Sequence, residues 1–84
     1  GTRTGERTRT GLLDLVRRSI IDILGPAAGE RFAPGRTFRE TGIDSLTAVE
    51  LRNSLAQATG LPLPATLVFD YPTPAVLVAR LEEL

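Results

Sequence analysis

Ser45 is the side chain best suited to covalent chemistry in this sequence, and Asp44 stands directly before it. Serine and aspartate both favour the start of a helix, and a helical pattern runs over residues 45–59 until Gly60 stops it. Gly42 interrupts whatever element comes before. The pattern therefore predicts a serine hydroxyl at the amino-terminal end of a helix, beside a carboxylate.

The rest of the sequence offers almost no other reactive side chain. The 84 residues include no Cys and no His, and all 10 basic residues are Arg. These absences exclude a disulfide framework, a Ser-His-Asp triad and a Ser-Lys dyad. The sequence also lacks a G-x-S-x-G elbow at this serine, because Leu46 and Thr47 follow Ser45. We therefore expect no catalysis by this chain alone, and any reaction of Ser45 must be activated by another protein.

One feature near Ser45 favours a phosphate attached to it, and another opposes it. Such a phosphate would lie at the amino end of a helix, where the helix dipole and free N–H groups favour an anion. Asp44 opposes it as a second negative charge. We expect Asp44 to cap the helix, to contact a basic pocket of a modifying enzyme, or both. From these residues alone, a serine that merely starts a helix remains an alternative.

Composition limits the class of protein and its partners. The 10 basic and 10 acidic residues balance, which argues against nucleic acid or an acidic membrane as a partner. No apolar run is long enough to span a bilayer and no secretory signal opens the sequence, so a cytoplasmic location is expected. The length suits one small monomeric domain. Because the sequence does not begin with Met, we expect it to be a piece of a longer polypeptide.

The first part of the chain is predicted to be a linker, a helix and a long loop. Residues 1–10 contain no apolar side chain and read as a flexible linker, with the folded domain over 11–84. A helix is predicted over 11–24, and its apolar face comprises Leu12, Leu13, Val16, Ile20, Ile23 and Leu24. Gly25 and Pro26 end it.

Residues 27–41 are too polar, and too often broken by Gly and Pro, to predict a regular element. Phe32 and Phe38 are its large apolar residues, and we expect them to pin the loop onto the core. A pair that stacks on a ligand is the alternative role for these two phenylalanines.

The helix predicted over 45–59 has more apolar surface than its packing requires. One face comprises Ala48, Leu51, Leu55 and Ala58. Leu46 and Val49 lie on the roughly opposite side, and Asn53 continues that line. Either a neighbouring loop or short helix covers this second stripe, or it is a docking surface beside Ser45.

The remainder of the chain predicts a short helix and a longer one. Residues 61–64 form an extended connector, and residues 65–69 form about one helical turn, with a short unpaired strand over 66–69 as the alternative. Thr73 and Pro74 open the last helix. Its core-facing residues are predicted to be Ala75, Leu77, Val78 and Leu81. The expected fold is all-α, a small four-helix bundle of three main helices and one short helix, with a long loop between the first two.

Two separate motifs resemble a known family. Residues 42–46, Gly-Ile-Asp-Ser-Leu, resemble the G-x-D-S-L signature of acyl carrier proteins. Residues 47–53 and 66–74 resemble the acyl carrier domains of modular type I polyketide synthases, which commonly have His at the position of Tyr71. The resemblance extends from about Leu12 to the end of the chain.

The resemblance implies a function for Ser45. A phosphopantetheinyl transferase would use coenzyme A, and a magnesium ion held largely in its own site, to attach 4'-phosphopantetheine covalently to Ser45. Polyketide acyl intermediates would then be carried as thioesters on this arm to the ketosynthase, acyltransferase, reductive and thioesterase domains of a multidomain synthase. The resemblance assigns partner binding to Asp44, Leu46, Val49, Glu50 and Asn53.

Three other functions are alternatives to this one. A peptidyl carrier domain of a nonribosomal peptide synthetase shares the fold and the arm, but usually has Gly-Gly where this chain has Gly42 and Ile43. A helical interaction domain would use Ser45 structurally or as a kinase target. A fragment of a serine esterase would need the base that this sequence lacks.

Overall fold

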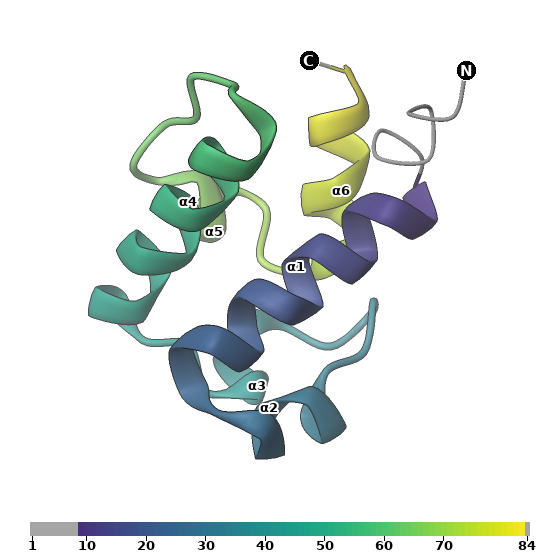
Figure 1. The fold of residues 1–84 in the computed structure, drawn as a ribbon, viewed down its shortest axis with the longest axis vertical. Helices are drawn as coiled ribbons and strands as arrows, with labels where there is room; N and C mark the ends of the chain where they lie inside the picture. The colour runs from purple at the N-terminus through teal and green to yellow at the C-terminus, as the bar shows by residue number, and fades with distance from the viewer. Residues whose placement is uncertain (1–8, 84) are drawn as a thin grey trace.

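The computed structural model describes residues 9–83, and the regular structure over that range consists only of helices (Figure 1). These helices are α1 (Arg9–Leu24), α2 (Pro26–Arg31), α3 (Phe38–Thr41), α4 (Ser45–Thr59), α5 (Leu67–Asp70) and α6 (Pro74–Glu83). The predicted all-α class is confirmed, and residues 66–69 form no strand. Across residues 9–83, no helix combines the length and apolar character that crossing a membrane requires.

Helix α1 begins two residues earlier than the pattern predicts. Arg9 and Thr10, assigned to the linker from the sequence, both belong to α1. The Arg9 guanidinium forms an ion pair with Glu82 of α6 at 3.2 Å, and this contact joins the start of α1 to the last turn of α6. The rest of the predicted linker, residues 1–8, lies outside the described residues.

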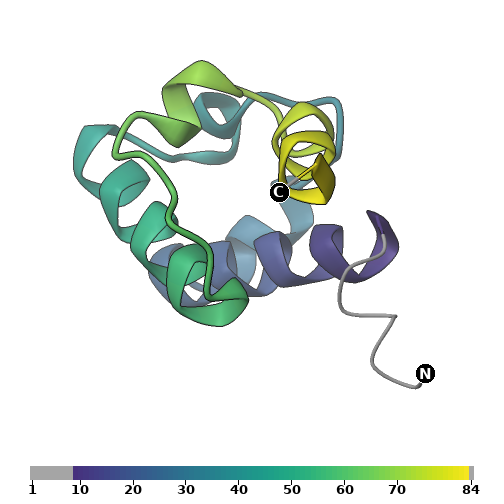
Figure 2. The same ribbon diagram turned by 90° about the horizontal axis from the view of Figure 1, so that it is seen from above.

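The core lies between three longer helices, with α1 packed against both α4 and α6 (Figure 2). Helix α2 packs against α1, and α5 packs against α4. The buried apolar side chains come from all of these elements and from two connections, and they are Leu12, Val16, Ile20, Ala28, Phe38, Ile43, Ala48, Leu51, Leu55, Leu63, Leu67, Val68, Leu77, Val78 and Leu81. Burial of each large one stabilises the fold by about 1.5–3 kcal/mol before chain entropy is counted.

The predicted core faces are confirmed except at two alanines. On α1, the predicted residues are either buried or partly buried against the core. Ala58 is exposed beside an open pocket between α1 and α4, and Ala56 packs against the core in its place. Ala75 is exposed in the first turn of α6, where Pro74 is buried instead. Both errors fall near helix ends, where fewer neighbouring elements cover the face.

The prediction of an irregular loop over 27–41 is wrong, because α2 and α3 form within this connection. Helix α2 starts at Pro26, whose missing N–H is not needed in the first turn, after Gly25 has turned the chain at φ 101°. Helix α3 is stabilised by a capping box, in which the Glu40 N–H donates to Thr37 Oγ1 and the Thr37 N–H donates to Glu40 Oε1, both at 3.1 Å.

Backbone hydrogen bonds fix this connection to the junction between α5 and α6. The Phe38 N–H donates to the Pro72 carbonyl at 2.8 Å, and the Ala75 N–H donates to the Pro34 carbonyl at 2.9 Å. Phe38 is buried and Phe32 is half-buried against the core, so the prediction that they pin the connection is confirmed. Helix α3 is therefore held rigidly across from α5.

Helix α5 is the predicted short helical turn, and it is held against α4. Leu67 and Val68 are buried in the core. The connector before them is tied to α4 by Arg52, whose Nε donates to the Leu63 carbonyl at 2.8 Å. This arrangement sets α5 beside the amino-terminal half of the bundle's α4 helix and leaves Phe69 at the surface.

Candidate functional site

The chain passes from α3 into α4 through a tight turn that is anchored on both sides. Gly42 adopts φ 119°, and its N–H donates to the carbonyls of Phe38 and Arg39. The Ile43 N–H donates to the Phe38 carbonyl at 2.9 Å, and the Ile43 side chain is buried. A left-handed residue followed by a buried one sets the position at which α4 begins, and so the position of Ser45.

Asp44 caps α4, as the sequence predicts. Its Oδ1 accepts from the Thr47 N–H at 2.9 Å, and its own N–H donates to Thr47 Oγ1 at 2.7 Å. Hydrogen bonds from the backbone and side chain of Thr47 lower the pKa of the Asp44 carboxyl below its ordinary value of 3.8. The carboxylate is exposed and stays charged at neutral pH.

Ser45 is the first residue of α4, and its side chain is free. It is exposed, and no hydrogen bond to another residue in 9–83 engages its hydroxyl. The two other serines in the sequence differ, because Ser19 is buried in α1 and Ser54 is half-buried in α4. Among the three, Ser45 is therefore the hydroxyl that another molecule can reach without moving a helix.

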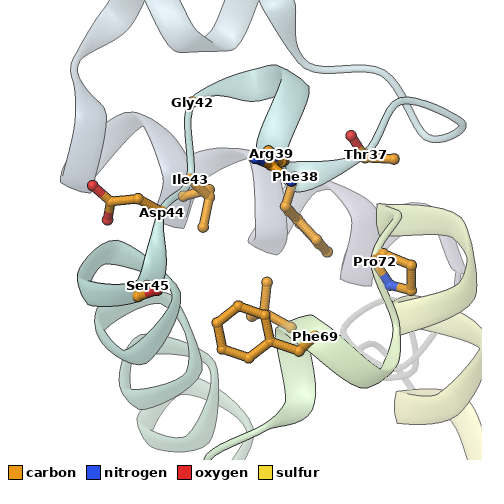
Figure 3. Close-up of a pocket in the computed structure, with 10 residues that line it drawn as sticks. Thr37, Phe38, Arg39, Gly42, Ile43, Asp44, Ser45, Phe69 and Pro72 are labelled. Carbon is orange, nitrogen blue, oxygen red and sulfur yellow. The ribbon is translucent and has the colours of Figure 1, made fainter.

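Ser45 lies at the edge of an open pocket of about 700 Å³ between α3, the start of α4, and α5 (Figure 3). The side chain of Phe69 extends from α5 into this space, and Phe38 points into it from α3 (Figure 3). Asp44 also lines the pocket, and its carboxylate is turned outward from it (Figure 3). Phe32 does not line it, so the alternative of Phe32 and Phe38 as a stacking pair is not the arrangement found.

The five residues predicted to bind partners all lie at the surface of α4 or at its cap. Leu46 is 69% exposed and Val49 is 41% exposed, so no loop or short helix in the described part of the chain covers this stripe. Glu50 and Asn53 are exposed too. The Asn53 Oδ1 accepts from the Arg52 guanidinium at 2.6 Å.

Two residues at this site are missed by the sequence analysis. Phe69 is 58% exposed and joins Leu46 and Val49 as an apolar side chain near Ser45, although it comes from a different helix. Arg39 lines the pocket from α3. A signal for Arg39 exists in the sequence, since the Thr-x-x-Glu capping box at 37–40 predicts a helical turn just before the serine motif.

A family model described as "Phosphopantetheine attachment site" matches residues 14–81. The chain belongs to this family. Its members carry 4'-phosphopantetheine as a covalently attached group, so the chain is a carrier domain. The matched range includes every residue of the site at the start of α4.

The carrier domain is similar in sequence to parts of polyketide synthases. It is 62% identical over 72 residues to polyketide synthase GfsB from Streptomyces halstedii, a match that covers 86% of this chain and 1% of the synthase. The "A1-type ACP domain from module 5 of MLSA1" has a TM-score of 0.81 and 42% identity, and the match covers 93% of this chain and 77% of that chain. The carrier domain is therefore homologous to polyketide synthase acyl carrier domains.

Peptidyl carrier proteins share the fold at lower sequence identity. A free-standing peptidyl carrier protein from Acinetobacter baumannii has a TM-score of 0.82 and 26% identity, with 92% of this chain and 95% of that chain covered. Fold alone does not separate the two kinds of carrier. Sequence identity does separate them, because it is 62% to the polyketide synthase and 26% to the peptidyl carrier protein.

The site at the start of α4 fits the group that the family carries. An ester on the Ser45 hydroxyl would displace no existing hydrogen bond and no buried side chain. The pocket beside it is open, so an attached chain has space to leave the surface. The phosphate of the arm would be the one strongly charged part of the group near the protein.

Proposed function

We propose that Ser45 is the residue to which 4'-phosphopantetheine is attached. The observation that supports this most strongly is that Ser45 is the one exposed serine in residues 9–83, with a hydroxyl free of partners, at the edge of an open pocket. Ser45 also falls within the range matched by the phosphopantetheine-attachment family. The cap at Asp44 and the buried Ile43 hold its backbone in place for an approaching enzyme.

Attachment requires a phosphopantetheinyl transferase. A bond forms between Ser45 Oγ and the phosphorus of coenzyme A that bears the pantetheine, while the pyrophosphate P–O bond breaks and adenosine 3',5'-bisphosphate leaves. The serine proton passes to a base of the transferase, because the chain has no His, Cys or Lys to accept it. The carrier domain contributes a positioned nucleophile. Asp44 adds a fixed negative charge beside it that a basic pocket of the transferase can recognise.

The cargo of the loaded domain is a polyketide acyl intermediate. When bound, the group supplies a terminal thiol on a flexible arm, and this thiol carries the acyl chain as a thioester. The domain itself is non-catalytic in this proposal. It presents its cargo to the ketosynthase, acyltransferase, reductive and thioesterase domains of a synthase, and tethering raises the concentration of cargo at each of them.

The surface around Ser45 supports brief contacts with several partners. Leu46 and Val49 offer apolar contact, Glu50 and Asn53 offer polar contact, and Phe69 extends the apolar part from α5. This surface is small, which suits weak interfaces that release their partner after each transfer. A monomeric domain in the cytoplasm, with no nucleic acid partner, remains the prediction from the sequence.

Loading in vitro tests the attachment residue. We expect the purified chain, incubated with coenzyme A and a broad-specificity phosphopantetheinyl transferase, to gain the mass of one phosphopantetheine, as measured by intact-protein mass spectrometry. Ser45→Ala should gain none. Ser54→Ala is the matched control, because it removes a half-buried hydroxyl from the same helix, and it should load like the wild type. Loading of Ser45→Ala would overturn the proposal.

A further inference from the structure

The amino end of α4 is not a vacant anion site. The Thr47 N–H, which would otherwise be available to a phosphate, already donates to Asp44 Oδ1 at 2.9 Å. Asp44 keeps its negative charge at neutral pH because Thr47 hydrogen bonds lower its pKa. A phosphate ester on Ser45 would therefore stand beside a fixed negative charge, with less help from the helix terminus than an uncapped helix gives. A cation from another element would offset this charge.

Within residues 9–83, Arg39 is the one cationic residue that lines the pocket beside Ser45. Its side chain is exposed, and it forms no ion pair or hydrogen bond with any residue in the range 9–83. Other arginines of the same connection are engaged. The Arg31 Nε donates to the Thr41 carbonyl at 3.1 Å, and an Arg36 Nη1 donates to the Arg31 carbonyl at 3.1 Å. Among Arg31, Arg36 and Arg39, the guanidinium of Arg39 is therefore the one with no partner in residues 9–83, and Arg39 lines the pocket.

The backbone that carries Arg39 is held in place from both sides. The Thr37 and Glu40 capping box fixes the turn of α3, and the neighbouring Phe38 is anchored by its burial and by its hydrogen bond to Pro72. Figure 3 shows Arg39 on the α3 side of the pocket, whereas the carboxylate of Asp44, which also lines the pocket, is turned outward from it. Arg39 and the Asp44 carboxylate are therefore carried by different elements, so attraction to Arg39 would draw an attached phosphate toward α3.

We propose that Arg39 binds the phosphate of the phosphodiester on Ser45 and directs the first part of the attached arm toward α3, away from the Asp44 carboxylate. The planar guanidinium matches the oxygens of a phosphate and can donate two hydrogen bonds to them. This proposal rests on Ser45 as the attachment residue. It assigns to Arg39 a role in positioning the arm, which is separate from recognition by partner enzymes.

Nuclear magnetic resonance of the loaded domain tests the contact directly. On loading, we expect the Nε–Hε signal of Arg39 to shift, while that of Arg36 stays in place because it does not line the pocket. The ³¹P signal of the phosphodiester should change in Arg39→Gln and stay near the wild-type position in Arg36→Gln. Arg39→Lys, which keeps the charge, should restore part of the change. Far-ultraviolet circular dichroism of each variant establishes that it is folded.

Salt gives a second readout that is independent of any synthase activity. The difference in melting temperature between loaded and unloaded domain should fall with added NaCl in the wild type and in Arg36→Gln. That salt dependence should be lost in Arg39→Gln. A loaded domain in which both the Arg39 signal and the ³¹P signal are unaffected by these changes would overturn the inference alone. Absence of any mass gain on loading would instead overturn the attachment proposal, and this inference with it.

Discussion

At the start of α4, the carboxylate of Asp44 is engaged by Thr47 while the hydroxyl of Ser45, one residue further on, has no partner in residues 9–83. Both residues line the pocket, and the Asp44 carboxylate is turned outward from it (Figure 3). One residue therefore stabilises the helix and its neighbour remains available for reaction. This division lets Ser45 be modified without removal of the cap.

Asp44 should make the stability of the domain depend on pH. Its pKa is lowered in the folded state below the ordinary 3.8, so its contribution to stability is present above that value and is lost as the pH falls through the lower folded pKa. Asp44→Asn keeps an acceptor oxygen but removes the charge. We expect the wild type to melt at a higher temperature than Asp44→Asn at neutral pH, and the difference to shrink in acid. A difference in melting temperature between wild type and Asp44→Asn that stays constant into strong acid would contradict a stabilising role for the Asp44 charge.

At the scale of elements, the position of Ser45 depends on how α3 is joined to α4. Only Gly42, Ile43 and Asp44 separate the two helices. Gly42 takes the backbone conformation that L side chains rarely adopt, and Ile43 fastens the turn to the core. Because the connection is this short, a change in its backbone must also move the first turn of α4.

Gly42→Ala tests this connection. A Cβ at Gly42 would meet Leu24 Cδ1 at 3.4 Å, which is an ordinary contact, so the cost arises from φ 119° and not from crowding. We expect a loss of about 1–3 kcal/mol in the free energy of unfolding, measured with urea. Gly35→Ala is the matched control, because Gly35 lies in the preceding connection, between α2 and α3, with nothing within 4 Å and no positive φ. Its stability should change by about 0.5 kcal/mol or less.

The longer elements could be predicted from the sequence, and the shorter ones could not. Helix α4 shows several turns of apolar periodicity and has Asp44 and Gly60 as clear ends, so its bounds match the pattern. Helices α2 and α3 are six and four residues long, which is too short for a periodic signal. Their signals are local instead, namely a proline after Gly25 and the capping box at 37–40, and both were available in the sequence.

The residues of the site that lie on α4 could be predicted from the sequence, and those that come from other helices could not. Ser45 and its neighbours on α4 belong to one motif, so spacing alone brings them together. Phe69 and Arg39 reach the same pocket only because backbone hydrogen bonds join the 34–38 segment to the α5–α6 junction. Those hydrogen bonds link residues far apart in sequence, and periodic patterns of apolar residues do not predict them.

At the scale of the whole molecule, one helix can serve both stability and recognition because its two faces are separate. Leu51 is fully buried and Leu46 is 69% exposed, although both belong to α4. The core side is shared with α1 and α5, which pack against α4. The outer side has no neighbour in the described part of the chain, so changes there leave the core intact.

Paired substitutions of these leucines test the separation. Leu51→Ala should lower the free energy of unfolding by about 2–5 kcal/mol, because it removes buried methyl groups and leaves a cavity. Leu46→Ala should change it by about 0.5 kcal/mol or less, since the side chain is in solvent. Urea titration followed by circular dichroism measures both. In the loaded domain, Leu46→Ala should nevertheless slow acyl transfer to a ketosynthase, and equal destabilisation by the two changes would contradict the face assignment.

The contact between Arg9 and Glu82 has a mechanical consequence. As an exposed ion pair it adds little energy, but it marks where the start of α1 and the end of α6 meet, whereas α4 begins at the far side of the bundle (Figure 1). Polypeptide joined to either of those helix ends would therefore be attached at the same end of the bundle. Ser45, at the opposite end, would then move farther than any residue near the attachment point when the domain rotates. The length of the domain itself would add to the distance over which cargo is delivered.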